Sequence, residues 1–256
     1  MYLDKPLRLW VSIVLLVFCS SLGAQIVNIE SRRTATDTSG WYGSVHADFN
    51  GSKTTRSTLA IFAGGDLQFK SDSGLNYWLF LSDFSLISGD NEKFSNAGFG
   101  HIRYNRKLNE TIRWEVFTQI QYNGLTKIDT RALVGTGPRI KLTQFEDAKF
   151  YLGVAYMYEY QELLDPIVYQ RHHRASSYFT FTLTPEEAVT FISTIYAQPL
   201  LSDFSDYRIM TETNLTLDIT KKLSFNVTFH YNFNAAPPAG VPTNTYYFRN
   251  GLRLSF

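Results

Sequence analysis

The chain of 256 residues contains one cysteine, Cys19, and no excess of charge of either sign. Cys19 lies in an N-terminal segment that we expect to be removed, which excludes disulfide bonds and thiolate metal sites from the mature protein. The 24 Lys and Arg residues oppose 23 Asp and Glu residues, for a net charge of +1. A balanced charge gives no reason to expect a nucleic-acid partner.

Long apolar runs are missing beyond the N-terminus. The first run, Leu9–Phe18, is shorter than the roughly 20 residues that a membrane helix needs. Lys5 and Arg8 precede it, and small residues follow it up to Ala24. This order is typical of a secretory signal peptide, with cleavage expected before Gln25.

Two alternatives to the signal peptide stay open. An uncleaved membrane anchor would require a longer apolar run. A lipoprotein would be modified at Cys19, but Phe18 is bulkier than the residue usual before such a cysteine. Removing residues 1–24 takes away Lys5, Arg8 and Asp4 and leaves a net charge of zero. An exported chain without later membrane helices is either a soluble protein or a β-barrel.

The composition favours the barrel. Aromatic residues make up 16% of the chain, with 20 Phe and 16 Tyr, while the mean hydropathy is only −0.16. A membrane barrel combines an apolar outer face with a polar lumen, which gives this average. Helix signals are nearly absent, and no long repeat or linker divides the chain.

Alternation of apolar and polar residues recurs from end to end and predicts strands with two different faces. In the clearest segment Trp114, Val116 and Ile120 share one face, and Glu115 and Gln119 share the other. We predict an all-β fold, a single antiparallel transmembrane β-barrel of about twelve strands. The expected strands are 41–50, 58–70, 74–84, 95–106, 111–123, 130–142, 148–160, 173–184, 187–198, 205–219, 222–233 and 245–256.

The alternating lengths of the connections between strands predict how the barrel is oriented in the membrane. Short turns are expected near 71–73, 106–110, 143–147, 184–186 and 220–221, and mostly longer links at 85–94, 161–172, 199–205 and 234–244. Short periplasmic turns and long external loops are the rule for these barrels, which places both termini in the periplasm. The expected organisation is a signal peptide (1–24), a periplasmic lead (25–40) and an outer-membrane barrel (41–256).

Two strands fit the pattern imperfectly. Pro138 lies inside the sixth strand, where it has no N–H for the ladder, so we expect a bulge there. The second strand carries Gly64 and Gly65, which suggest a kink where the wall bends. The last strand ends on Phe256, and a terminal aromatic strand after a secretory signal resembles the assembly signal of Gram-negative outer-membrane barrels.

Six phrases of the sequence resemble the YdiY-like "salt-induced outer membrane protein" family, a domain of unknown function. In order they are QIVNIES (25–31), GHIRY (100–104), GTGPR (135–139), YMYEY (156–160), QPLLSDF (198–204) and TKKLSF (220–225). Together they span most of the mature chain. The resemblance implies an outer-membrane β-barrel. It implies no substrate and no catalytic residue.

Charged side chains on the predicted inner faces are the main candidates for function. One interpretation is cross-strand ion pairs that brace a closed lumen; the other is an arginine-rich pore that favours anions. The basic positions are Arg103, Arg113, Arg131, Arg139, Lys141, Arg174, Arg208, Arg249 and Arg253, and the acidic ones are Asp48, Asp66, Glu115, Glu159, Glu212 and Asp218. The candidate lumen-lining residues are His101, Arg103, Arg113, Glu115, Arg131, Arg139, Glu159, Arg208 and Glu212.

Outward aromatics near the strand ends predict the two girdles at the membrane surfaces. The candidates are Trp41, Trp114, Tyr122 and Tyr160. In a soluble β-sandwich the same residues would be core, but so many apolar faces would need a very large core.

Catalysis and metal binding receive little support. His46, His101 and His230 lie on predicted inner faces of three separate strands, and a polar lumen explains them without a metal. Ser176 and Ser177 lie near His172 and His173, but no signature of a barrel lipase or protease is present.

We therefore predict a barrel in the outer membrane of a Gram-negative bacterium, acting as a small passive channel or solute-binding barrel. The alternatives are a structural, stress-related envelope protein with a closed lumen, and a barrel hydrolase. No cofactor or metal is expected. The expected partners are outer-membrane lipids, the barrel assembly machinery and small solutes.

Overall fold

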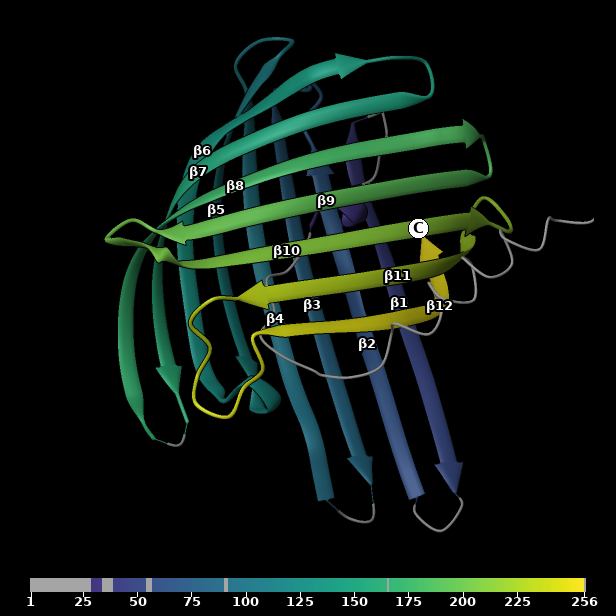
Figure 1. Cartoon of the computed structure of the whole chain (residues 1–256). Coiled ribbons are helices and arrows are strands. Elements are labelled where there is room, and N and C mark those ends of the chain that lie inside the picture. Colours follow the sequence, from purple (N-terminus) through teal and green to yellow (C-terminus); the bar gives the residue numbers. More distant parts are fainter. Residues whose placement is uncertain (1–28, 34–38, 54–56, 90–91, 165, 256) are drawn as a thin grey trace, which may run out of the picture.

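Twelve antiparallel strands close into a barrel in the computed structural model, which describes residues 29–33, 39–53, 57–89, 92–164 and 166–255 (Figure 1). Each strand pairs with its neighbours in sequence, and β1 pairs with β12. The predicted class and strand number are confirmed. The strands are β1 (Gly40–Lys53), β2 (Ser57–Lys70), β3 (Asn76–Gly89), β4 (Glu92–Lys107), β5 (Ile112–Asn123), β6 (Ile128–Gln144), β7 (Ala148–Leu163), β8 (Val168–Glu186), β9 (Val189–Leu200), β10 (Asp203–Asp218), β11 (Leu223–Asn234) and β12 (Asn244–Ser255).

Two short 3-10 helices accompany the strands, η1 (Glu30–Arg32) before β1 and η2 (Gly124–Thr126) between β5 and β6. No helix in the described part of the chain is long and apolar enough to cross a membrane.

The alternation of side chains decides which face of each strand looks inward. On β5, Val116 is 42% exposed on the outside, whereas Glu115 and Gln119 are buried in the lumen. A shift of one residue would exchange these two faces, so the apolar and polar sets fix the register. The buried interior of this molecule is therefore largely polar, with small apolar clusters, and many of its large apolar residues face outward.

The links between strands are shorter than expected on the side away from the chain ends. The strands continue into the segments predicted as long loops, so that β7 and β8 are separated by only 164–167 and β9 and β10 by 201–202. Only the link 235–243, between β11 and β12, remains long among those four. The shortest strands have 12 residues, and a tilted strand needs about 9–11 to span a membrane. The strands thus have length to spare, and the prediction of long loops was wrong because these segments stay paired.

The predicted bulge at Pro138 is also wrong. Trp114 of β5 lies opposite Pro138, and the pairs that β6 makes with β7 before and after it keep one register. The irregularities lie at the two ends of β6, between 128 and 130 and between 141 and 143. A Cβ on Gly137 would lie 2.1 Å from the carbonyl oxygen of Val154, so β6 and β7 approach closely here. The missing proline N–H interrupts this ladder without shifting it.

Gly64 makes room inside the barrel. The pairing of β2 with both neighbours is continuous through Gly64 and Gly65. A Cβ on Gly64 would lie 2.7 Å from Cε1 of His46 and 2.0 Å from Oδ1 of Asp83. The glycine therefore leaves space for the contact between His46 and Asp83 in the lumen.

The closing pair of strands is joined over a much shorter stretch than its neighbours. β1 pairs with β12 at four positions, from Ser44 with Ser255 to Ala47 with Leu252. By contrast, β1 pairs with β2 at fourteen positions and β12 with β11 at eleven. Beyond Ala47 and Leu252 the facing edges of β1 and β12 are not paired with each other, and the two strands diverge (Figure 1).

An arginine on the lipid face should be costly in the middle of a strand and mild at its end. We expect Val116→Arg to destabilise the barrel by roughly 2–4 kcal/mol, and Leu108→Arg, in the exposed turn between β4 and β5, by about 0–1 kcal/mol. The measurement is urea unfolding in lipid vesicles. Equal costs at the two positions would contradict the placement of the lipid face.

Candidate functional site

A segment preceding the first strand lies inside the barrel. The side chain of Ile29 is fully buried against Leu79 and Leu81 on the inner face of β3. Residues 25–40 were expected to form a periplasmic lead. The described residues 29–33 instead lie within the lumen, because they supply both an apolar anchor and charged groups that the wall neutralises. We call residues 29–33 the plug segment.

Arg32 fixes the plug segment to the wall formed by β2 and β3. Its NH2 group donates to Oδ1 of Asp83 at 2.7 Å, and its NH1 group lies 4.0 Å from Asp66. The amide of Gln68 donates to the backbone oxygen of Arg32 at 2.8 Å. Since contacts hold both the side chain and the backbone of Arg32, they fix the position of the plug segment against β2 and β3.

Arg33 and Glu30 fix the same segment to β4, β5 and β6. Arg33 donates to Oε1 of Glu115 at 2.6 Å and to Asn105 at 3.2 Å. Glu30 accepts from Arg139 at 2.5 Å and from Arg33 at 2.9 Å. The plug segment therefore completes an ion-pair network that the wall alone would leave unbalanced.

Glu115 is the centre of this network. Its carboxylate also accepts from Arg103 at 2.7 Å and from the hydroxyl of Tyr178 at 2.9 Å. Tyr178 comes from β8, across the lumen from β5, so these contacts fill the interior rather than line its wall. Buried charges are tolerated when they are paired and hydrogen-bonded, as they are here.

A second cluster surrounds Glu159 of β7, whose side chain is fully buried. Arg131 donates to Oε2 of Glu159 at 2.8 Å from its Nε, and Arg208 donates to the same oxygen at 2.8 Å. Arg174 lies 3.7 Å from Oε1 and donates to both oxygens of Asp206 at 3.0 and 3.1 Å. One carboxylate thus lies against three arginines, and Asp206 is a further partner of Arg174, which makes Glu159 the critical member.

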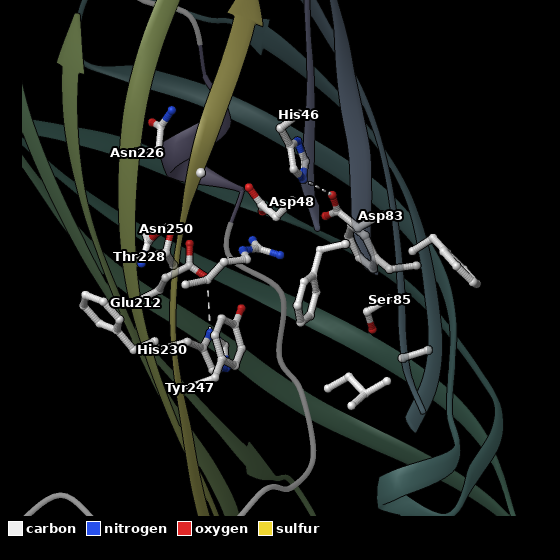
Figure 2. A pocket seen from close by; sticks show the side chains of 18 of the residues that line it. His46, Asp48, Asp83, Ser85, Glu212, Asn226, Thr228, His230, Tyr247 and Asn250 are labelled. Carbon is white, nitrogen blue, oxygen red and sulfur yellow. Dashed lines mark hydrogen bonds and ion pairs between the residues drawn. The ribbon is translucent and has the colours of Figure 1, made fainter. Parts of the chain in front are cut away.

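The remaining interior holds a cavity of about 220 Å³. Two acid–histidine pairs stand in it: His46 lies 3.3 Å from Asp83, and Nδ1 of His230 lies 3.1 Å from Glu212 (Figure 2). The ring of His230 stacks on Tyr247 at 4.7 Å between centroids. Other lining residues include Asp48, Phe62, Gln121, Asn226, Thr228, Arg249 and Arg253. The cavity therefore offers charges of both signs, amides, hydroxyls and aromatic rings.

The structure distributes the predicted lumen residues over three places. The network around Glu115 holds Arg103 and Arg139, and the cluster around Glu159 holds Arg131 and Arg208. Glu212 lines the cavity. His101 is buried and bonded to Gln119 at 3.1 Å, and Arg113 is only half-buried, opposite Arg139.

The predicted girdle residues lie on the outer face. Trp41, Trp114 and Tyr122 are exposed, and Tyr160 is half-buried. Trp41 packs on Phe69 at 4.9 Å, and the indole N–H of Trp114 donates to Thr136 at 2.8 Å. Phe256 lies outside the described residues, so its role as an assembly signal stays a prediction.

The histidines and serines do not assemble a catalytic or metal centre within the described ranges. His46, His101 and His230 have separate partners, and no group of three or more His, Cys, Asp or Glu there is placed to hold a metal. Ser176 accepts from the amide of Gln198, and Ser177 donates to a backbone oxygen. Neither serine forms the bond to a histidine that activates a nucleophile.

Several functional residues were missed from the sequence. The plug segment was expected to belong to a polar periplasmic lead. It contains one apolar residue, Ile29, together with the charged residues Glu30, Arg32 and Arg33. Asp83 was missed even though it shares the inward parity of Leu79 and Leu81 on β3. Asp206 lies within the predicted strand 205–219, but it was not among the acidic positions assigned to the inner face.

Comparisons with known proteins agree with this architecture. The family model "Protein of unknown function, DUF481" matches residues 63–256, and the chain belongs to this family. The YdiY-like family is the DUF481 family, so the predicted resemblance is confirmed. No curated protein matches the chain.

Among solved structures, the translocator domain of the autotransporter NalP from Neisseria meningitidis is similar with a TM-score of 0.50 and 8% identity, covering 89% of this chain and 92% of that one. The NanC porin has a TM-score of 0.49 and 12% identity, covering 84% and 97%; the KdgM porin has 0.44 and 14%, covering 85% and 99%. At these identities the likeness to NalP establishes the fold alone.

Removing the charge of Glu159 should destabilise the barrel strongly. In Glu159→Gln three buried arginines lose their shared carboxylate, and breaking a buried pair costs about 3–5 kcal/mol. The measurement is the temperature at which the folded form disappears on detergent gels. Glu110→Gln is the matched control, because Glu110 is exposed and pairs only with Lys107 at the surface; this variant should behave as the parent does.

Proposed function

We propose that this protein is a solute-binding barrel and narrow passive channel of the outer membrane. The observation that carries the proposal is the cavity of about 220 Å³ inside the barrel, which is lined with charged and aromatic groups. Concave sites with a few convergent polar groups are the usual places of ligand binding. An engineered cavity of about 150 Å³ holds benzene, so this cavity has room for a small solute.

The plug segment limits passage. It occupies the lumen between β3 on one side and β5 and β6 on another, held by ion pairs to Asp83, Glu115 and Arg139. Water and small ions would have to pass around it. We therefore expect a low conductance, with a mild preference for anions, because Arg249 and Arg253 line the cavity without an ion-pair partner in the described part of the chain.

A structural role with a closed lumen is the second candidate. The same buried clusters around Glu115 and Glu159 favour it, since they brace the wall from inside. The two proposals differ in one measurable property, the passage of solutes.

Loosening the plug segment should raise conductance. The double variant Arg32→Gln/Arg33→Gln removes both charged attachments to Asp83 and Glu115. We expect single-channel conductance in planar bilayers, and the rate of liposome swelling in small sugars, to rise several-fold. Arg106→Gln, at an exposed end of β4, should leave both unchanged. A parent and a double variant that are both impermeable would support the structural role instead.

The membrane location and the assembly signal can be tested together. We expect the protein in the outer-membrane fraction, with a folded form that migrates differently in detergent gels before and after heating. Deleting Phe256 should lower the assembled amount more than the exported amount, because the terminal strand must also close the barrel and free edges are not tolerated in lipid. Assembly at normal levels without Phe256, or a parent protein in the soluble periplasm, would contradict these expectations.

A further inference from the structure

We propose that the divergence of β1 and β12 forms a lateral opening between lipid and lumen. Through it a single-chain amphiphile places an anionic head group, carboxylate or phosphate, in the cavity while its chain stays in the lipid. The inference deepens the binding part of the proposed function and does not depend on conduction.

The opening is bounded by the last pair of the closing strands. Asp48 would continue the register opposite Gly251, and Phe49 opposite Asn250, but pairing ends at Ala47 and Leu252. From there β1 remains paired only with β2, and β12 only with β11. Two strand edges therefore face one another without a shared ladder.

These edges lie beside the lipid-facing band. Phe49 of β1 is 76% exposed and Phe248 of β12 is 64% exposed. Val45, Leu252 and Leu254, which belong to the closing pairs, continue this apolar band on the outer face. Unpaired backbone groups at membrane depth are costly unless they line a water-filled cavity or are covered by protein. The adjacent cavity supplies the water, which explains how the edges persist in this band.

The cavity reaches this opening. Its lining includes Asp48 of β1 and residues 248–253 of β12, which contribute both inward and outward positions. A Cβ on Gly251 would lie 1.5 Å from Oδ1 of Asp48. The absence of a side chain at Gly251 thus leaves room for the carboxylate of Asp48 at the point where the pairing ends.

Two arginines give the part of the cavity beside Gly251, which we call the recess, its preference for anions. Arg249 and Arg253 flank Gly251 on the inward face of β12, and neither forms an ion pair with any carboxylate of the described chain. Arg249 lies over the rings of Phe62 and Tyr247 at 5.7 and 5.8 Å, which leaves the hydrogen-bonding edge of its guanidinium available. Guanidinium groups bind carboxylate and phosphate through paired N–H bonds.

Asp48 and His230 indicate which kind of head group the recess would bind. Asp48 stands opposite Gly251, between the two arginines, and offsets one of their charges, so the recess accommodates one anionic head. Nε2 of the buried His230 has no hydrogen-bond partner and lines the same cavity, where it adds a polar group. Since the cavity holds a head group and not a long chain, the chain must leave through the opening.

Cysteine pairs test the opening itself. In purified protein, Val45→Cys/Leu254→Cys joins two paired positions and should form a disulfide on mild oxidation. Phe49→Cys/Asn250→Cys joins the first outward pair beyond the ladder and should stay reduced, because a disulfide requires Cα atoms within about 7 Å. The mature chain is expected to have no other cysteine. Equal oxidation rates of the two pairs would overturn the lateral opening.

Binding measurements test the ligand. Calorimetry in maltoside detergent should detect palmitate and hexadecyl phosphate, with affinities at least tenfold weaker in Arg249→Gln and unchanged in Arg171→Gln, an exposed position on β8. Comparing the two amphiphiles tells carboxylate from phosphate recognition. Dodecyltrimethylammonium, with a cationic head, should not bind.

Binding of head groups without an alkyl chain distinguishes this inference from the proposed function. Acetate and inorganic phosphate should bind far more weakly than their long-chain counterparts. If they bind equally well, or if the parent binds neither amphiphile, the lateral route is overturned while a solute channel stands. Amphiphile binding by a barrel that does not conduct would support the inference and count against the channel.

Discussion

Hydrogen bonding between neighbouring strands is the constraint on which the rest of this structure depends. A strand in lipid has no water to satisfy its backbone, so its edges must be paired unless they are covered by protein or line a water-filled cavity. Eleven of the twelve interfaces join strands that follow one another in the chain, and the twelfth joins its two ends. That last interface is also the shortest, with four pairs. The interface between the two strands most distant in the chain is thus the least paired, and a cavity of about 220 Å³ lies beside it.

The packing of the lumen follows from a second constraint, the cost of buried charge. Alternation brings many charged side chains inward, and each then needs a partner because water is largely excluded. The wall supplies some partners through neighbouring strands, as between Arg131 of β6 and Glu159 of β7. It lacks others, and the plug segment supplies them: Glu30 meets Arg139, while Arg33 meets Glu115. The segment therefore belongs to the electrostatic core of the barrel and not to its exterior.

These two constraints give the interior two different regions, one dense with ion pairs and one that contains a cavity. Around β4 to β10 much of the lumen is occupied by ion pairs and by side chains such as Tyr178 and Met157. Where β11, β12, β1 and β2 face β3 and the near ends of β4 and β5, a cavity remains, and Arg249 and Arg253, which line it, form no ion pair within the described residues. Dense ion pairing beside a cavity is a suitable arrangement for binding, because the ion pairs brace the wall while the cavity leaves room for a ligand.

Much of the fold was predictable, and the exceptions have physical causes. The strand positions followed from alternation, since the period of two is a local property that each segment carries by itself. Link lengths were misjudged because polar segments such as 161–172 remain paired above the apolar band, where hydropathy no longer distinguishes a strand from a loop. Pro138 did not force a bulge: β6 and β7 approach closely at Gly137, and their pairs keep one register on both sides of the proline.

The candidate site also has a part that could be predicted from the sequence and a part that could not. The inward direction of Arg103, Glu115, Arg131 and Glu159 could be predicted from parity. Their grouping around two carboxylates could not, because it depends on which strands face one another across the lumen, as β5 and β8 do through Glu115 and Tyr178.

The sequence by itself determined the class of fold, the number of strands and the face on which each side chain lies, since these follow from local periodicity and from the chemistry of lipid and water. Only the tertiary structure decided where the plug segment lies, which charges share a carboxylate, and how far β1 and β12 are joined. Those features depend on distances across a closed barrel between segments remote in the chain, and no local pattern encodes such distances.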